Sequence, residues 1–381
     1  MSLKSIGDIN RYVSESINPL NYPNQEFELY SVPSFSTGRP EVVFGKDIGA
    51  SKQIVNKNDI LICKINPRIN RVWKVGQFTD KPLLASSEWV VFRNSEINPD
   101  YLVYYFSSPL FRQYLNSELT GIGGSLTRAQ PKQIRKYPVP IPSRNEQDKI
   151  ATILNNISYL INARNIQLKK FDELVKSRFV ELFGDPIADT PKFPLKKIRE
   201  FAKCIAGATP STKNEQYWKN GNIPWMSSGE VHDTRVWSTD KKITQLGYNS
   251  CSTKMIPAHT VVIAMAGQGK TRGTVAVAEI PLCTNQSLCS ILTDKTIDTD
   301  YLFTYLRFQY NSLRNISNGS SGRGGLNIKL IGEFRVSVPP LSMQKQFSLF
   351  LNQLDKSKLA VQKSLNELEV LKKSLMQQYF G

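Results

Sequence analysis

The sequence predicts an α+β protein with a pseudo-two-fold internal repeat: two similar mixed α/β domains separated by two long helices that pair as an antiparallel coiled coil. Three observations predict this fold class. Residues 142–184 align without a gap with residues 339–381, at an offset of 197. Both copies carry apolar residues at heptad spacing. A longer stretch that contains short β-branched runs precedes each copy.

The first predicted domain covers residues 1–141. Its strand-like runs, 60–64 and 89–93, are rich in β-branched residues and are bounded by turn-forming residues. A helix rich in Tyr and Phe is expected to begin at Asp100, and a glycine loop, 121–124, follows it. These features predict a mixed α/β domain.

The first long helix is predicted over residues 142–184. Prolines at positions 138, 140 and 142 precede it, and because proline restricts the chain to extended conformations, they mark the boundary. About 37 helical residues at ~1.5 Å each give a rod of roughly 55 Å, which indicates a spacer rather than a domain helix. Its predicted coiled-coil seam consists of Leu154, Ile157, Ile161, Arg164, Leu168, Phe171, Val175, Arg178 and Leu182.

The second half repeats this order, with a domain over 185–338 and a helical spacer over 339–381. Strand-like runs occur at 260–265 and 274–278, and Asp300 begins a second Tyr/Phe-rich helix. The second seam consists of Leu351, Leu354, Lys358, Val361, Leu365, Leu368, Lys372, Leu375 and Tyr379. Two basic residues interrupt each seam, and such residues can fix the register of a coiled coil.

Net charge is the unusual property of the composition. The chain has 49 Lys and Arg against 32 Asp and Glu, a formal net charge of +17. Such an excess favours a polyanionic partner, of which nucleic acid is the commonest. No apolar run approaches the roughly 20 residues that span a bilayer, and no signal peptide is recognisable, so a cytoplasmic location is expected.

Metal sites and disulfides are not indicated. The five cysteines form no CxxC pair, and the chain has only two histidines, His232 and His259. We therefore expect no zinc site and buried, reduced thiols.

One segment resembles a nucleotide-binding loop. Residues 264–271, Ala-Met-Ala-Gly-Gln-Gly-Lys-Thr, fit a relaxed P-loop pattern. A P-loop needs a helix directly after it, because the helix N-terminus holds the phosphates, whereas a strand-like run follows here. We interpret the segment as a basic loop between two strands, and the first half has a corresponding basic loop at 64–71.

Residues 209–229 mix turn formers, amides, hydroxyls and aromatics, which are side chains that hold phosphates and read base edges. Trp218 and Trp225 within this segment are interpreted as core anchors. Catalytic patterns are missing from the sequence: there is no nuclease carboxylate–lysine motif, no amino-methyltransferase Asn-Pro-Pro-Tyr, and no nucleophile elbow. The chain is therefore interpreted as a protein that recognises a ligand and does not itself catalyse a reaction.

The two proline-to-helix junctions are similar to those of a known family. Pro-Ile-Pro-Ser-Arg-Asn-Glu-Gln-Asp-Lys-Ile at 140–150 and Val-Pro-Pro-Leu-Ser-Met-Gln-Lys-Gln-Phe at 338–347 resemble the conserved-region openings of type I restriction-modification specificity subunits. Thr209-Pro210-Ser211, together with Ile223-Pro224-Trp225, resembles the start of a target recognition domain in that family. The first half lacks this signature.

The resemblance implies a non-catalytic subunit that reads DNA. Each domain would recognise one half of a bipartite double-stranded target, and the paired helices would set the spacing and dock two methyltransferase subunits. S-adenosylmethionine, ATP and Mg would be bound by partner subunits, which include restriction and translocase subunits. No cofactor is expected on this chain.

Basic and polar residues of the predicted loops are the expected DNA contacts. They are Lys64, Asn66, Arg68, Arg71 and Arg128 in the first half, and Lys213, Ser227, Lys270, Arg272 and Arg323 in the second. Two other functions remain open from the sequence: a nucleotide-binding factor that uses the 264–271 loop, and a scaffold whose basic surface binds RNA or an acidic protein.

Overall fold

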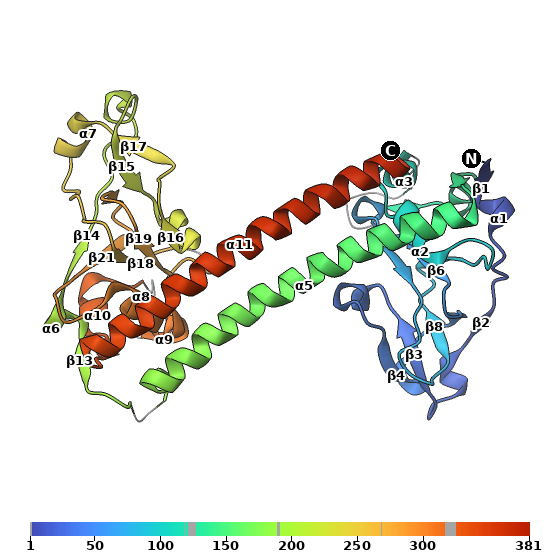
Figure 1. Ribbon diagram of the computed structural model, residues 1–381, viewed down its shortest axis with the longest axis horizontal. Coiled ribbons are helices and arrows are strands. Elements are labelled where there is room, and N and C mark those ends of the chain that lie inside the picture. The colour runs from blue at the N-terminus through green and yellow to red at the C-terminus, as the bar shows by residue number, and fades with distance from the viewer. Residues whose placement is uncertain (1, 118, 121–126, 189–190, 268, 317–324) are drawn as a thin grey trace. The chain divides into compact units, whose positions relative to one another are not determined.

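The chain folds into two compact units. The computed structural model describes residues 2–117, 119–120, 127–188, 191–267, 269–316 and 325–381. Unit 1 comprises Met1–Ile166 and Val361–Gly381, and unit 2 comprises Gln167–Ala360. Each unit contains a mixed α/β domain together with one end of each long helix (Figure 1). The fold class predicted from the sequence is confirmed.

Unit 1 contains two main sheets, of five and three strands, in the orders β2-β5-β8-β3-β4 and β7-β6-β9. A two-stranded sheet pairs β1 with β12 next to the long helix. The strands are β1 (Ser2–Ser5), β2 (Ser16–Ile17), β3 (Glu26–Tyr30), β4 (Glu41–Phe44), β5 (Lys52–Ile54), β6 (Ile60–Cys63), β7 (Val72–Lys74), β8 (Leu83–Ala85), β9 (Trp89–Phe92), β10 (Leu119–Thr120), β11 (Arg128–Ala129) and β12 (Pro138–Ile141). The short helices are α1 (Ile6–Ile9), α2 (Pro99–Phe106), α3 (Pro109–Ser117) and α4 (Pro131–Ile134).

Unit 2 also has a five-stranded and a three-stranded sheet, in the orders β14-β21-β18-β19-β16 and β17-β15-β20. Its strands are β13 (Leu195–Lys197), β14 (Ala202–Ala206), β15 (Ile223–Met226), β16 (Arg235–Val236), β17 (Lys241–Ile243), β18 (Thr260–Ala264), β19 (Val275–Ala278), β20 (Cys283–Thr284), β21 (Leu288–Thr293) and β22 (Arg335–Ser337). Its short helices are α6 (Ile198–Phe201), α7 (Gln245–Asn249), α8 (Thr299–Phe308), α9 (Tyr310–Ile316) and α10 (Ile328–Glu333).

The two units repeat the same connections between elements. In unit 1, β1 and α1 precede the β6–β7 hairpin, and α2 to α4 lead into β12. In unit 2, β13 and α6 precede the β18–β19 hairpin, and α8 to α10 lead into β22. The pairing of β1 with β12 corresponds to that of β13 with β22. All four predicted strand runs and both Tyr/Phe-rich helices are confirmed within one or two residues.

The long helices α5 (Arg144–Phe183) and α11 (Leu341–Phe380) each have 40 residues. Every predicted seam residue is buried or half-buried, so the heptad interpretation is confirmed. In unit 1 the end of α11 packs with the start of α5, and in unit 2 the start of α11 packs with the end of α5. This arrangement makes the pair antiparallel.

Two seam lysines of α11 have identifiable partners. Lys358 Nζ forms an ion pair with Asp172 Oδ1 at 2.5 Å. Lys372 Nζ lies 5.8 Å from the centroid of the Tyr104 ring, and burial lowers the pKa of this lysine. Each lysine is therefore accommodated by a particular neighbour, which is how a polar seam residue specifies register.

Aromatic side chains join each helix end to its domain core. In unit 1 the ring of Phe380 lies 5.4 Å from that of Tyr101. In unit 2 the ring of Phe183, 197 residues earlier in the chain than Phe380, lies 4.8 Å from that of Tyr301. The ends of α11 and α5 therefore play the same part in the two cores.

The cysteines are free thiols: Cys63, Cys283 and Cys289 are buried, and Cys204 and Cys251 are half-buried. Burial raises the pKa of the Cys283 thiol to about 11. Within the described ranges, no helix is both long and apolar enough to cross a bilayer.

Candidate nucleic-acid interface

The basic loop of unit 1 is the turn of the β6–β7 hairpin. It contains a 3₁₀ turn, Pro67–Ile69, which is flanked by Asn66 and Asn70 with φ of 45° and 47°. Asparagine is one of the few residues that adopt this left-handed conformation readily. The loop is held by backbone hydrogen bonds from Asn66 N to Thr127 O (2.9 Å) and from Ala129 N to Lys64 O (2.8 Å).

All five predicted contact residues of the first half come together here. Lys64, Asn66, Arg68 and Arg71 lie on or beside the hairpin turn, and Arg128 lies in β11, which a backbone bridge joins to Ile65. The side chains of Arg68 and Arg128 are exposed, and the other three are half-buried. Arg128 forms an ion pair with Glu88 at 3.2 Å. The five residues therefore lie on one hairpin turn and on the strand beside it, and their role in DNA contact stays a prediction.

The corresponding loop of unit 2 is the turn of the antiparallel β18–β19 hairpin. Arg314 Nη1 donates to the carbonyl of Gly269 (2.7 Å), and the Tyr310 hydroxyl donates to that of Lys270 (2.9 Å). Gly273, with φ of 83°, packs against the Arg314 side chain. In the described residues 269–278 the loop leads into a strand, so the predicted strand–loop–strand arrangement is confirmed.

The predicted contacts of the second half are more dispersed. Lys270 and Arg272 lie on the β18–β19 hairpin, with Lys270 exposed. Lys213 is exposed just before the 3₁₀ turn Glu215–Tyr217. Ser227 is the N-cap residue of the 3₁₀ helix Ser228–Asp233, and its hydroxyl and backbone N–H both donate to Glu230 Oε2, at 2.8 Å and 2.6 Å. Arg323 lies outside the described residues.

The tryptophans of the 209–229 segment form part of a small core. Trp225 is buried, and its ring packs edge-on against Trp218 at 5.0 Å. The segment also reaches the turn before β21, where the Thr209 hydroxyl donates to Gln286 Oε1. Gln286 was not predicted, because the signal is a contact between residues far apart in sequence.

A buried glutamine fixes each domain to its long helix. Gln147 Oε1 accepts from Asn98 N (2.9 Å), and Gln147 Nε2 donates to Pro142 O (2.9 Å). Gln344 repeats this, with Asp298 N at 2.8 Å and Pro339 O at 2.8 Å. These residues were not predicted as functional, although their coincidence at the 197 offset is a signal that could have identified them.

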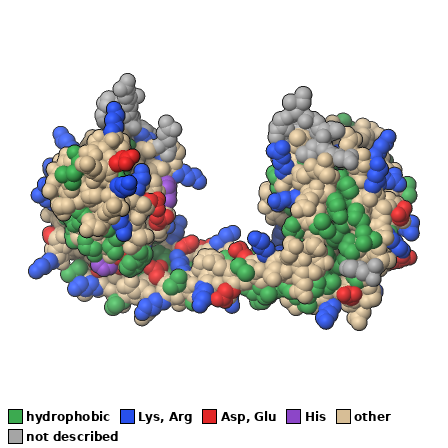
Figure 2. Space-filling model, turned by 90° about the horizontal axis from the view of Figure 1, so that it is seen from above, with side chains coloured by type: hydrophobic (Ala, Val, Ile, Leu, Met, Phe, Trp, Pro, Cys, Tyr) green, Lys and Arg blue, Asp and Glu red, His purple; other side chains and the backbone are tan. Residues whose placement is uncertain are grey.

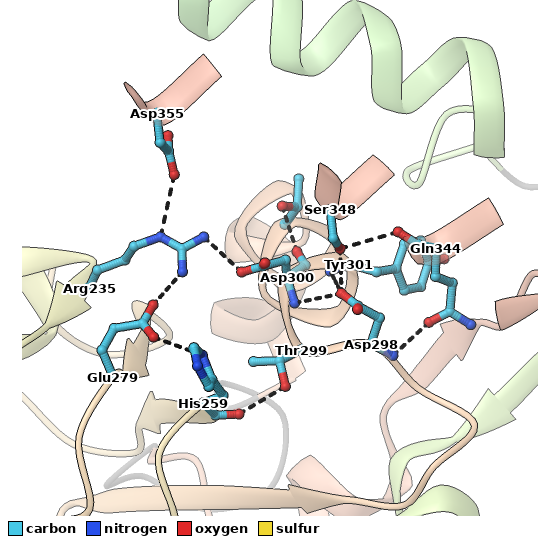
Figure 3. Close-up of polar contacts among 11 residues, drawn as sticks. Arg235, His259, Glu279, Asp298, Thr299, Asp300, Tyr301, Gln344, Ser348 and Asp355 are labelled. Carbon is cyan, nitrogen blue, oxygen red and sulfur yellow. Dashed lines mark hydrogen bonds and ion pairs between the residues drawn. The ribbon is translucent and has the colours of Figure 1, made fainter. Parts of the chain in front are cut away.

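In unit 2 a cluster of charged side chains provides a further contact between the domain and its long helix α11 (Figure 3). Arg235 contacts the carboxylates of Glu279, of Asp300 at 2.7 Å and of Asp355 at 3.5 Å, the last of which lies on α11. His259 Nδ1 lies 2.8 Å from Glu279. One arginine therefore links β16, the end of β19, α8 and α11.

The surface charge agrees with the composition. Lys and Arg side chains are spread over the visible face of each unit, with Asp and Glu among them (Figure 2). Among the residues that the structure describes, no group of three His, Cys, Asp or Glu side chains could hold a metal ion.

Both long helices carry large apolar side chains that are exposed to solvent. Their exposed fractions range from 37% for Val180 to 73% for Leu359. Those above 40% exposure are Tyr159, Leu160, Ile166, Leu174, Leu349, Leu359, Val370 and Leu371. Leu174 and Leu371 are equivalent at the 197 offset.

Comparison with known families gives one family over both halves. Residues 1–170 and 192–370 match the family described as "Type I restriction modification DNA specificity domain". Among curated proteins, the putative type I restriction enzyme MjaX specificity subunit of Methanocaldococcus jannaschii is 23% identical over 94% of this chain and 86% of its own length. The EcoR124I/EcoR124II specificity subunit of Escherichia coli is also 23% identical, and the match spans 58% of this chain and only 56% of that protein.

Solved structures show the same fold. The S subunit of the type I restriction-modification system from M. genitalium matches with a TM-score of 0.57 at 15% identity, covering 100% of this chain and 96% of that one. A chain from a structure of type I R-M complex assembly matches with a TM-score of 0.61 at 16% identity, covering 100% and 97%.

Proposed function

Because this chain belongs to the family of type I restriction-modification specificity subunits, we propose that it reads a bipartite double-stranded DNA target, each mixed α/β domain recognising one half-site. The observation that carries the proposal is the family match to both halves of an internal repeat. The proposed reading domains are 1–141 and 185–338, and the proposed spacers are 142–184 and 339–381.

The two hairpin loops support phosphate and base contact. Lys64, Asn66, Arg68, Arg71 and Arg128 lie on and beside the hairpin turn of unit 1, and the exposed Lys270 and the half-buried Arg272 lie on the equivalent turn of unit 2. Cations on such loops neutralise phosphates and release condensed counterions. Lys213, Ser227 and Arg323 complete the proposed set of contacts.

The long helices are proposed to fix the spacing between half-sites and to dock methyltransferase subunits. A helix of 40 residues is about 60 Å long at ~1.5 Å per residue, so it can act as a spacer on the scale of a bipartite site. The exposed apolar side chains of α5 and α11 support a docking role, because such side chains are commonly covered by a partner.

Chemistry is assigned in this proposal to partner subunits. Two methyltransferase subunits would bind S-adenosylmethionine and transfer the methyl group. Restriction and translocase subunits would bind ATP and Mg and act in cleavage. This chain would contribute selection of the site and no catalytic group.

A domain exchange tests the proposal. Residues 1–141 are replaced by the first domain of another specificity subunit, and the complex is expressed with its methyltransferase. Methylome sequencing is expected to show one half-site changed, with the other half-site and the spacing retained. A change in both half-sites, or in neither, would contradict the assignment of one domain to one half-site.

Lys270→Ala is expected to weaken binding and make it less sensitive to salt. Because Lys270 is exposed on the hairpin turn, loss of one phosphate contact would reduce the slope of log K against log salt by about 0.9. Fluorescence anisotropy over a salt series measures both quantities. Lys254→Ala, at another exposed lysine of unit 2, is the matched control and should leave the slope unchanged. An unaltered slope for Lys270→Ala would remove this residue from the interface.

A further inference from the structure

An open cleft lies beside the basic hairpin of unit 2, at the start of the turn. Its volume is about 480 Å³. Met265 and Leu326, both buried, contribute apolar walls together with the exposed Ile328. The remaining lining residues are Ala266, Gln286, Ser287, Asn327 and Lys329. The cleft therefore combines apolar walls with two amides, of Gln286 and Asn327, and the cation of Lys329.

Gln286 is held in a defined orientation at this cleft. Its Oε1 accepts a hydrogen bond from the hydroxyl of Thr209. A carbonyl oxygen has a second lone pair, and the amide Nε2 carries two donor hydrogens. The exposed Gln286 side chain can therefore present one acceptor and one donor to a planar ligand while it stays fixed by Thr209.

The same backbone frame occurs in unit 1. Met265 N bonds to Ser287 O (2.8 Å), and Leu326 N bonds to Met265 O (3.0 Å). In unit 1, Lys64 N bonds to Glu88 O (3.1 Å), and Ala129 N bonds to Lys64 O (2.8 Å). Lys64 is thus equivalent to Met265, Glu88 to Ser287, and Ala129 to Leu326.

The side chains on this shared frame differ. In unit 1 the frame carries Glu88 and Arg128, which form an ion pair at 3.2 Å. In unit 2 the equivalent positions are Ser287 and Gly325, neither of which carries a long side chain. The two units therefore share the backbone hydrogen bonds but carry different side chains at equivalent positions. Two sites that bind similar but different ligands need this combination.

We propose that the chain reads base identity at this frame in each unit, with Arg128 selecting guanine in one half-site and Gln286, next to Ser287, selecting adenine of an A·T pair in the other. This proposal rests on the proposed function, and it adds the ligand of each site. Arg128 and Gln286 are the specificity-determining residues, and Glu88 and Thr209 are positioning residues that orient them.

The base edges match these groups. Guanine presents two acceptors, O6 and N7, in the major groove, and arginine binds both. Adenine presents the N7 acceptor and the N6 donor, which glutamine binds through its donor and its acceptor. Thymine carries a methyl group, which apolar walls such as those formed by Met265, Leu326 and Ile328 accommodate.

Substitutions that change the pattern of donors and acceptors test the proposal. The whole complex with its methyltransferase is used, and methylomes are compared. Arg128→Gln is expected to change one position of the first-domain half-site from guanine to adenine. Gln286→Glu, which can only accept, is expected to change one position of the second-domain half-site from adenine to cytosine. Methylation at the original base should fall by about ten-fold or more.

Each variant contains its own control, because the half-site read by the unaltered unit should stay the same. Lys57→Ala and Lys254→Ala, at exposed lysines away from these frames, should leave both half-sites unchanged. The proposal is overturned if both variants keep the original motif at every position, or if methylation falls evenly at all bases. A wild-type complex without any bipartite motif would instead contradict the proposed function.

Discussion

Arg235→Met is expected to destabilise unit 2 by about 3–5 kcal/mol, because it removes the cation from three carboxylates. The Glu279 side chain is only 1% exposed and that of Asp300 17%. In the variant, Glu279 would keep one partner of the cluster, His259 Nδ1 at 2.8 Å, but the His259 side chain is largely exposed. Methionine preserves much of the apolar stem of arginine, so the expected loss comes mainly from the uncompensated charges.

Hydrogen–deuterium exchange with mass spectrometry measures this effect unit by unit. Peptides that cover β18, β19 and α8 should exchange faster in the variant, whereas peptides that cover β6 and β9 should not change. Arg199→Met is the control, since Arg199 forms its ion pair with Glu333 at a more exposed position, where its own side chain is 61% exposed. Such a surface pair contributes about 1 kcal/mol or less. Equal effects of the two substitutions would show that the Arg235 cluster is not a buried network.

Gln147→Met and Gln344→Met are expected to cost about 2–4 kcal/mol each, because each leaves a buried proline carbonyl and a part-buried backbone N–H without this partner. The two glutamines are 2% and 0% exposed. Both accept from the backbone of the residue that caps the Tyr/Phe-rich helix, and both donate to a proline carbonyl at the entry of the long helix. Methionine occupies a similar volume, so a cavity contributes little.

Because the chain contains an internal repeat, the effects of the two substitutions can be compared with each other. Because the contacts are the same, the two losses should agree within about 1 kcal/mol, apart from an additional bond from Gln344 to Thr296 O at 3.1 Å. Exchange rates at the start of α2 and of α8 measure them separately. Gln353→Met, at an exposed position of α11, should change stability by no more than about 0.5 kcal/mol. A large loss at one glutamine and none at the other would contradict an equivalent role.

Features that repeat along the sequence were predictable. The seams follow from the spacing of residues such as Leu154 and Leu351, because one helix face must bury its apolar side chains. The hairpin between β18 and β19 follows from two β-branched runs on either side of a glycine-containing loop. Both signals lie within a short window of sequence, and both were confirmed.

Features that depend on distant contacts were not predictable. The pairing of Leu3 with Pro140 joins positions at opposite ends of the first domain. Gln286 and Glu88 gain significance only when the turns before β21 and β9 are placed beside the hairpins. Glu28 is a buried carboxylate that binds the backbone of Phe78 and Thr79, and no local pattern predicts that loop. In each case tertiary packing supplies the partner.

The division of the chain into units also bears on the order of events during synthesis. The core of unit 1 includes Phe380 and takes contacts from Leu375 and Tyr379, whereas unit 2 is the continuous segment Gln167–Ala360. The ribosome therefore completes all of unit 2 before it supplies the last segment that unit 1 needs. We therefore expect the amino-terminal domain, although its residues are made first, to finish folding last and until then to expose apolar surface to chaperones and proteases.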